Sequence, residues 1–182
     1  MVSCGGSGGS SSSGGSASNT IVVIGDSIGT GFGVATPYPT RIRSSTGATV
    51  ISDSVNGRMT AAGAGIVGSL LNSHRPTHLV VLLGTNDAIR GDVGTALRNL
   101  QSIVNTANAS GVIPILGTLP AITRSASFDV KADQISSGIP GLGARVAQVR
   151  LALGDGSTTL ADGIHPNDFG QQLIANAFIG QL

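Results

Sequence analysis

Five short apolar runs, rich in β-branched residues, recur along this chain at intervals of about thirty residues. Between them lie stretches in which apolar residues repeat at helical spacing. This alternation predicts β-α units, and therefore a parallel sheet that is buried on both faces. Right-handed crossovers would then place functional groups at the carboxyl ends of the strands. The predicted strands span residues 20–25, 48–52, 78–84, 112–118 and 144–149.

Helices are predicted between these runs and after the last one. Residues 60–73 and 93–109 have helical periodicity, and Asp92 is placed to cap the second helix. A weaker helical pattern covers residues 129–139, and a last helix begins near Pro166. The apolar face predicted for that last helix comprises Phe169, Leu173, Ile174, Ala177 and Phe178.

The chain begins with a segment that differs in composition from the rest. Residues 1–19 are nearly all Gly and Ser and cannot bury a core, so they predict a flexible tether before a domain at 20–182. Cys4 and the Gly/Ser run after it resemble the lipobox cysteine and tether of a bacterial lipoprotein, although no hydrophobic signal segment precedes them here. We therefore expect an extracytoplasmic bacterial protein, in the periplasm or at the cell surface, that is lipid-anchored through Cys4. The alternative is an exposed cysteine in a tail.

Composition excludes several classes of protein. The formal net charge is +1 and the ten basic residues are scattered, so no nucleic-acid surface is expected. No apolar run approaches the roughly 18 residues that a membrane span needs. The chain has no Glu, which excludes an H-E-x-x-H zinc protease. His74 and His78 are four residues apart, but Pro76 breaks the helix that would align them, so no metal site is expected.

The stretch "IVVIGDSIGTGFG" at residues 21–33 joins the first strand to a glycine-rich turn. No Lys follows, so it is not a phosphate-binding P-loop, and Val34 stands where a dinucleotide fingerprint needs its third Gly. The pattern G-x-S-x-G does fit, with Ser27 between Gly25 and Gly29. Such a turn after a strand can hold a serine hydroxyl clear of the backbone. Ser27 is therefore a candidate nucleophile.

A nucleophilic serine needs a base and an acid that orients the base. Only His165 has suitable surroundings, in "ADGIHPND", because Asp162 lies three residues before it and Gly163 permits the bend between them. One loop can then hold the carboxylate against the imidazole Nδ1 and leave Nε2 free. The arrangement is not that of the α/β-hydrolases, because Ser27 follows the first strand and the acid and base share one loop near the C-terminus.

These motifs together resemble the SGNH (GDSL-type) serine hydrolases. The family's blocks occur in order over residues 25–166, as "GDSIGTG", "SVNGRMT", "GTND" and "DGIHP". The stretches "GTNDAIRGD" and "TLPA" further resemble the bacterial lysophospholipase/thioesterase/arylesterase branch. The resemblance implies a three-layer, flavodoxin-like α/β fold with a five-stranded parallel sheet in the strand order 2-1-3-4-5.

The resemblance also implies roles for individual residues. Ser27 is the expected nucleophile, His165 the general base, and Asp162 the residue that orients the imidazole. The oxyanion hole would consist of the backbone N–H groups of Ser27 and Gly57 and the side-chain amide of Asn86. These three donors come from separate loops, which can meet if the first strand lies between the second and the third. Asp26 is expected to be structural.

The sequence thus predicts a serine esterase that hydrolyses small carboxylic esters through an acyl-enzyme, with lysophospholipids and thioesters among its candidate substrates. We expect it to be a monomer, to need no cofactor and to contact a membrane only through Cys4. Two alternatives stay open, a polysaccharide O-deacetylase of the same family and a non-catalytic, surface-tethered binding module. The acyl chain length and the leaving group depend on loops 30–40, 87–92 and 119–130.

Overall fold

The computed structural model describes Met1 and residues 19–182. Most of the predicted tether at 1–19, including Cys4, lies outside the described residues. In the part of the chain that is described, no helix is both long enough and apolar enough to cross a membrane.

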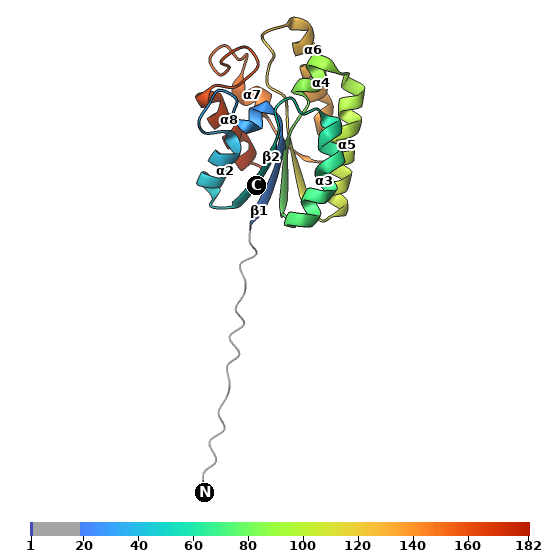
Figure 1. Ribbon diagram of the computed structural model, residues 1–182, viewed down its shortest axis with the longest axis vertical. Coiled ribbons are helices and arrows are strands. Elements are labelled where there is room, and N and C mark those ends of the chain that lie inside the picture. The colour runs from blue at the N-terminus through green and yellow to red at the C-terminus, as the bar shows by residue number, and fades with distance from the viewer. Residues whose placement is uncertain (2–18) are drawn as a thin grey trace.

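A five-stranded parallel sheet forms the centre of the domain, in the order β2-β1-β3-β4-β5 (Figure 1). This confirms the predicted strand order. Strand β1 lies between β2 and β3 and is buried at all six positions, because it pairs on both sides and helices cover both of its faces. The strands are β1 (Thr20–Gly25), β2 (Thr49–Ser54), β3 (His78–Leu82), β4 (Ile113–Gly117) and β5 (Arg145–Ala147).

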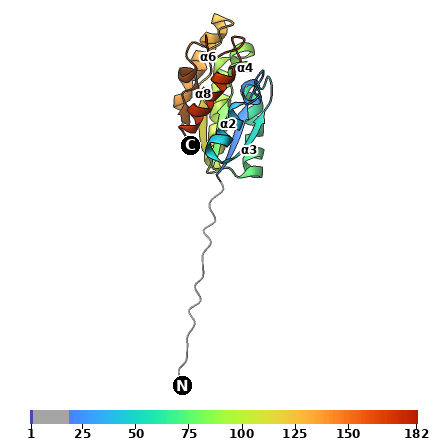
Figure 2. The same cartoon turned by 90° about the vertical axis from the view of Figure 1, so that its left-hand side faces the viewer.

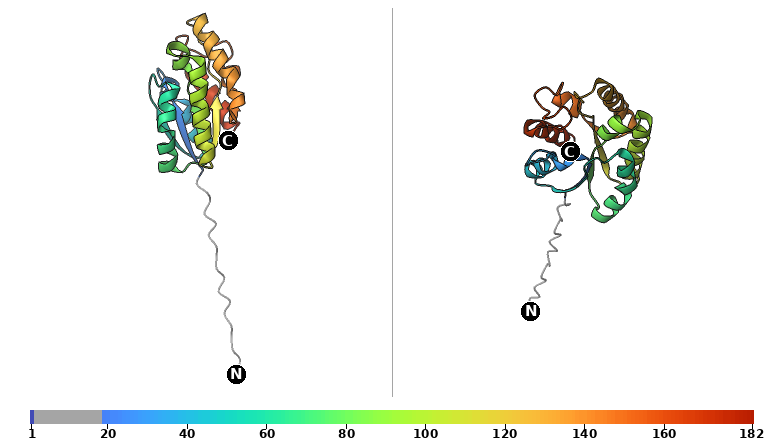
Figure 3. Two further views of the ribbon diagram at one scale, coloured as in Figure 1. Left: turned by 90° about the vertical axis from the view of Figure 1, so that its right-hand side faces the viewer. Right: turned by 45° about the horizontal axis from the view of Figure 1, so that its top comes forward.

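Helices cover the two faces of the sheet and make the fold three-layered (Figures 1 and 2). One face carries α3 (Thr60–His74), α5 (Val93–Ala109) and α6 (Ala126–Gly138), which Figure 3 shows side by side. The other face carries α2 (Tyr38–Thr46) and α8 (Asp168–Ile179), with α7 (Val149–Leu153) packed on α8. The remaining elements are short: α1 (Ser27–Thr30), α4 (Thr85–Arg90) and the 3₁₀ turn η1 (Ile139–Leu142).

The predicted helix boundaries agree with the structure where the sequence carries a cap. Asp92 caps α5 as predicted, and its side chain accepts a hydrogen bond of 2.8 Å from the Thr95 N–H. At the start of α8 the cap is Asn167, one residue after the predicted Pro166, and it accepts from the Gly170 N–H. Both are the side-chain bonds that satisfy the free N–H groups of a helix start.

Three expectations from the sequence are wrong. The third strand ends at Leu82 rather than at 84. The last strand ends at Ala147 rather than at 149, because Val149 begins α7 and is buried there as a helical residue. Phe169 is 58% exposed rather than part of the buried face of α8. Instead, the first turns of α8 bury the side chain of Gln171. This side chain accepts a hydrogen bond from the Tyr38 N–H (2.8 Å) and donates one to the Ile28 carbonyl (3.0 Å). A polar residue can thus face the core, since its hydrogen bonds are made there.

Candidate active site

The turn after β1 carries Ser27 at the start of α1. Its flanking glycines are required by space, because a Cβ on Gly25 would lie 2.8 Å from Ser54 Oγ and one on Gly29 only 2.3 Å from it. The turn can therefore lie directly against the end of β2. Asp26 caps α1 and accepts a hydrogen bond of 2.9 Å from the Ile28 N–H. The Ser27 side chain is half-buried at the carboxyl end of the sheet.

The structure brings the predicted nucleophile, base and acid together. His165 Nε2 lies 3.1 Å from Ser27 Oγ, and His165 Nδ1 lies 2.8 Å from Asp162 Oδ2. Between acid and base, Gly163 has a φ of 82°, a left-handed conformation that favours glycine. The three side chains form a continuous hydrogen-bonded chain from the carboxylate to the hydroxyl.

Asp162 is held in position by its own loop. Its Oδ1 atom accepts hydrogen bonds from the backbone N–H groups of Ile164 (3.0 Å) and His165 (2.8 Å). Burial raises the pKa of the Asp162 carboxyl, but the hydrogen bonds from the His165 backbone and ring and from Ile164 outweigh this and bring it to about 2. The carboxylate is therefore ionised over the whole range in which an esterase is assayed.

The β2–α3 loop (55–59) places Gly57 beside the same turn. The Val55 N–H donates to the Gly25 carbonyl (3.2 Å), and Thr30 Oγ1 donates to Asn56 Oδ1 (2.6 Å). Both bonds hold this loop against the nucleophile turn. Gly57 itself has a φ of 76°, a left-handed backbone conformation that other residues rarely adopt.

Asn86 reaches the site from the start of α4, after β3. Its Nδ2 atom donates to Asp26 Oδ2 (3.1 Å) and to the Arg58 carbonyl oxygen (3.2 Å). Its Oδ1 atom accepts from Arg90 Nη2 at 2.8 Å. The structure thus brings the predicted oxyanion-hole residues Ser27, Gly57 and Asn86 to one end of β1, which lies between β2 and β3.

Asp26 is buried, with only 1% of its surface exposed. Burial raises the pKa of Asp26 to about 6, against the opposing effects of the Ile28 N–H, the nearby His165 and the Asn86 amide. At neutral pH the side chain is an ionised acceptor that faces Asn86. The residue is structural as expected, and it also touches a residue of the site.

A family model decides the classification of this chain. The GDSL-like lipase/acylhydrolase family matches residues 23–173, which include every residue of the site described above. The chain belongs to this family. The result confirms the resemblance seen in the sequence and the prediction of a hydrolase that acts on ester bonds.

Known relatives resemble this GDSL hydrolase over most of its length. The Escherichia coli (strain K12) protein named thioesterase 1/protease 1/lysophospholipase L1 is 27% identical over 178 residues, which cover 90% of this chain and 83% of the relative. A lipolytic GDSL-family protein from Veillonella parvula superposes with a TM-score of 0.78 at 20% identity, over 88% of this chain and 96% of that one. The acetylxylan esterase Axe2 from Geobacillus stearothermophilus superposes with a TM-score of 0.77 at 17% identity, over 90% of this chain and 93% of that one. These two structures share the fold.

Two segments of the GDSL hydrolase lie against the His165 loop. The ring of Phe32, which is 52% exposed, lies with its centroid 4.5 Å from that of the His165 ring. The second segment contains Thr123 and Arg124. A Cβ placed on Gly163 would come 2.8 Å from Thr123 Oγ1 and 3.2 Å from the Arg124 backbone nitrogen. The β4–α6 loop (118–125) therefore packs closely against the turn that joins Asp162 to His165.

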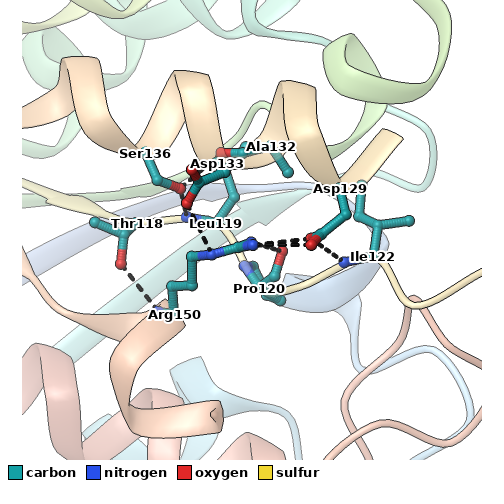
Figure 4. A network of polar contacts seen from close by, with 9 residues as sticks. All are labelled: Thr118, Leu119, Pro120, Ile122, Asp129, Ala132, Asp133, Ser136 and Arg150. Carbon is teal, nitrogen blue, oxygen red and sulfur yellow. Dashed lines mark hydrogen bonds and ion pairs between the residues drawn. The ribbon is translucent and has the colours of Figure 1, made fainter. Parts of the chain in front are cut away.

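A polar network holds the β4–α6 loop in place (Figure 4). Arg150 Nη2 lies 3.0 Å from both carboxylate oxygens of Asp129, and Arg150 Nη1 donates to the Pro120 carbonyl. Asp129 Oδ1 also accepts from the Ile122 N–H at 2.8 Å. Arg150 also pairs with Asp133, whose Oδ1 atom lies 3.3 Å from the Arg150 Nε atom. The Arg150–Asp129 pair between α7 and α6 thus fixes two backbone groups of the loop that borders the site.

Three side chains near the site were not found from the sequence. Gln171 ties α8 to α1, Arg150 anchors the β4–α6 loop, and Arg90 contacts Gly57 and Asn86. Arg90 stands in the stretch "GTNDAIRGD" that carried the resemblance to the bacterial branch, so a signal for it was present. Gln171 and Arg150 have no local pattern that marks them.

The arrangement has the parts that acyl transfer by a serine requires. A hydroxyl lies within hydrogen-bonding reach of an imidazole whose other nitrogen is held by an ionised carboxylate. Such a set can move a proton from the serine to the histidine and back. Among residues 19–182 we find no group of three His, Cys or Asp side chains arranged to hold a metal ion.

Proposed function

We propose that this protein is a serine esterase that hydrolyses small carboxylic esters through an acyl-enzyme. The observation that carries the proposal is the hydrogen-bonded chain from Asp162 through His165 to Ser27, with 2.8 Å and 3.1 Å between the paired atoms. Ser27 Oγ attacks the ester carbonyl carbon while its proton moves to His165 Nε2. Asp162 keeps the imidazole oriented and stabilises its charged form.

The tetrahedral intermediate carries a negative charge on the former carbonyl oxygen. The proposed donors to this oxygen are the N–H groups of Ser27 and Gly57 and the amide of Asn86. When the intermediate collapses, the bond to the alcohol breaks, and the leaving oxygen takes the proton from His165 Nε2. Water then gives a proton to His165 and attacks the acyl-enzyme. The carboxylic acid leaves and Ser27 recovers its proton.

The surroundings of Ser27 support an apolar acyl or alcohol group in the substrate. Phe32 and Val55 are exposed by 52% and 49%, and both border the nucleophile turn. Phe32 lies on the His165 ring, and the Val55 N–H is bonded to the Gly25 carbonyl. Thioesters and lysophospholipids are further candidates, because the E. coli relative is named for activity on both.

Turnover of p-nitrophenyl acetate by the purified protein tests the proposal. We expect the wild-type protein to hydrolyse it and Ser27→Ala to be inactive but folded, since Ser27 lies on a turn. A fluorophosphonate should label Ser27 alone. Activity that persists in Ser27→Ala, or labelling of another serine, would refute the assignment.

A panel of p-nitrophenyl esters with increasing acyl length, together with a thioester, a lysophospholipid and acetylated xylan, then identifies the substrate class. A preference for acetylated xylan over every soluble ester would favour the deacetylase alternative. No turnover of any of these compounds would favour the binding module.

A further inference from the structure

Arg90, the last residue of α4, connects the loop that carries Gly57 with Asn86 at the start of its own helix. Its Nη2 atom donates to the Gly57 carbonyl oxygen at 2.7 Å and to Asn86 Oδ1 at 2.8 Å. One guanidinium nitrogen therefore contacts both residues that, under the proposed function, supply oxyanion donors from outside the nucleophile turn. The side chain comes from the solvent side, since Arg90 is exposed.

The contact with Arg90 determines which way the Asn86 amide faces. A guanidinium has donors only, so the amide must turn its oxygen towards Arg90. On the opposite side, Nδ2 faces two acceptors, Asp26 Oδ2 and the Arg58 carbonyl oxygen, at 3.1 and 3.2 Å. A flipped amide would set donor against donor on one side and acceptor against acceptor on the other. The amide N–H group is the one that an oxyanion needs.

The same nitrogen restrains Gly57. This glycine has a φ of 76°, and a Cβ placed on it would lie 3.5 Å from Arg90 Nη2, so the guanidinium lies directly against its backbone. A glycine loop has much conformational freedom to lose. A hydrogen bond to the Gly57 carbonyl restricts the φ and ψ angles of this residue. It thereby restricts the directions in which the Gly57 N–H can point.

The charge of Arg90 is not paired within the described part of the chain. No ion pair between Arg90 and a carboxylate is found among residues 19–182, whereas Arg58 on the β2–α3 loop is paired with Asp53. The guanidinium lies on the oxygen side of the Asn86 amide. Its positive charge stabilises the negative charge that develops on an oxyanion at the amide nitrogen, although solvent screens the effect.

We propose that Arg90 is a positioning residue of the oxyanion hole, which sets the orientation of the Asn86 amide and of the Gly57 peptide through one shared nitrogen. This proposal rests on the proposed function. Arg90 bonds Gly57 and Asn86 rather than Ser27 or His165, so we expect it to act on the rate mainly through the two donors, with a smaller contribution from its solvent-screened charge.

Arg90→Met tests the proposal, because it keeps an unbranched apolar stem and removes the guanidinium donors. We expect kcat for p-nitrophenyl acetate to fall roughly 10- to 100-fold, somewhat less than the loss of a whole donor, with KM changed less than about twofold. The acidic limb of the kcat/KM profile should stay in place, since the His165–Asp162 pair is untouched. Arg98→Met is the matched control and should behave as wild type, because Arg98 is exposed and its side chain bonds Thr95 alone among residues 19–182.

A double-mutant cycle separates positioning from other effects. In an Asn86→Ala background there is no amide to orient, so Arg90→Met should cost much less than in the wild type. Arg90→Lys keeps the charge and loses the planar fork, and we expect it to lose most of the same activity. Arg90→Lys also serves as a second variant if Arg90→Met proves unstable.

Three results would overturn the inference. They are unchanged kcat in Arg90→Met, an equal cost of that substitution with and without Asn86, and full activity in Arg90→Lys, which would mean that charge alone matters. The failure of the proposed function is seen separately, as absent turnover or absent Ser27 labelling in the wild-type protein.

Discussion

Asp26 and Asn86 are joined by a hydrogen bond of 3.1 Å, in which a nearly fully buried carboxylate accepts from the amide that the oxyanion hole would use. The bond connects the nucleophile turn to the start of α4, which follows β3. In the free protein it occupies part of the amide's donor capacity, and the Arg58 carbonyl occupies the rest. An oxyanion must therefore compete with these acceptors, and it does so best when it carries full charge.

This competition predicts the effect of Asn86→Ala. The donor should contribute little to an uncharged ester and much to the charged intermediate. We expect kcat to fall about 10²–10³-fold, or roughly 3–4 kcal/mol, with little change in KM. Steady-state kinetics on p-nitrophenyl acetate measure both constants. A raised KM with kcat intact would contradict the role of Asn86.

Asp162→Asn should have a different signature, because Asp162 acts through His165. The pKa of Asp162 is about 2, so the carboxylate is charged whenever the imidazole works. Without it the imidazole loses the partner that orients it and balances its charged form. We expect a large fall in rate together with a displaced acidic limb of kcat/KM. In Asn86→Ala the limb should not move, which makes that variant the control. An unmoved limb in Asp162→Asn would count against its role.

The raised pKa of Asp26 predicts how stability depends on pH. The folded protein holds this proton up to about pH 6, whereas the unfolded chain loses it near the ordinary pKa of 3.8. Between these values the folded state binds more protons, so the free energy of unfolding should fall as pH rises, by at most about 1.4 kcal/mol per pH unit. Above pH 6 both states are ionised and the dependence ends.

Urea unfolding at intervals from pH 4 to 7 measures this slope, and Asp26→Asn should reduce it. Asp155→Asn is the control, because hydrogen bonding to Ser157 lowers the pKa of Asp155. Asp155→Asn should therefore leave the dependence of the unfolding free energy on pH unchanged between pH 4 and 6. An identical slope in Asp26→Asn and the wild type would show that the buried carboxyl does not titrate there.

The ion pair behind the β4–α6 loop predicts a loss of stability in Asp129→Ala. The side chains of Arg150 and Asp129 are 24% and 35% exposed, and the carboxylate also bonds the Ile122 N–H. Removing it should cost about 2 kcal/mol, since hydrogen bonds to charged groups are lost, while Arg150 keeps Asp133, 3.3 Å from its Nε atom, as an anionic partner. Thermal or urea unfolding measures this cost.

Asp168→Ala is the matched control for that experiment. Asp168 also pairs with an arginine, Arg41, but its side chain is 74% exposed. Exposed pairs contribute about 0–1 kcal/mol, so this variant should lose less stability than Asp129→Ala. Equal losses in the two variants would show that burial does not decide the contribution.

Much of the fold could be predicted because its signals are local. Short apolar runs that alternate with helical patterns indicate a parallel sheet, and the strands lie within a few residues of the expected places. Helix α2 was missed, since its start contains Pro37 and Pro39 and its apolar residues are few. What stabilises it is packing on α8, where the rings of Tyr38 and Phe178 stack with centroids 5.6 Å apart. Such a contact joins residues far apart in the chain and leaves no periodic pattern.

The sequence by itself determined which residues could form the site. Asp162 and His165 are three residues apart, so one loop suffices to pair them, and the glycines around Ser27 mark a tight turn. Only the tertiary structure decided that His165 meets Ser27 across 138 residues, that Asp26 is buried beside Asn86, and that Arg90 joins Asn86 to Gly57. The physical reason is that hydrogen bonds between loops and the desolvation of a carboxylate depend on distances in space. Those distances are set by the order of the strands and the packing of the helices.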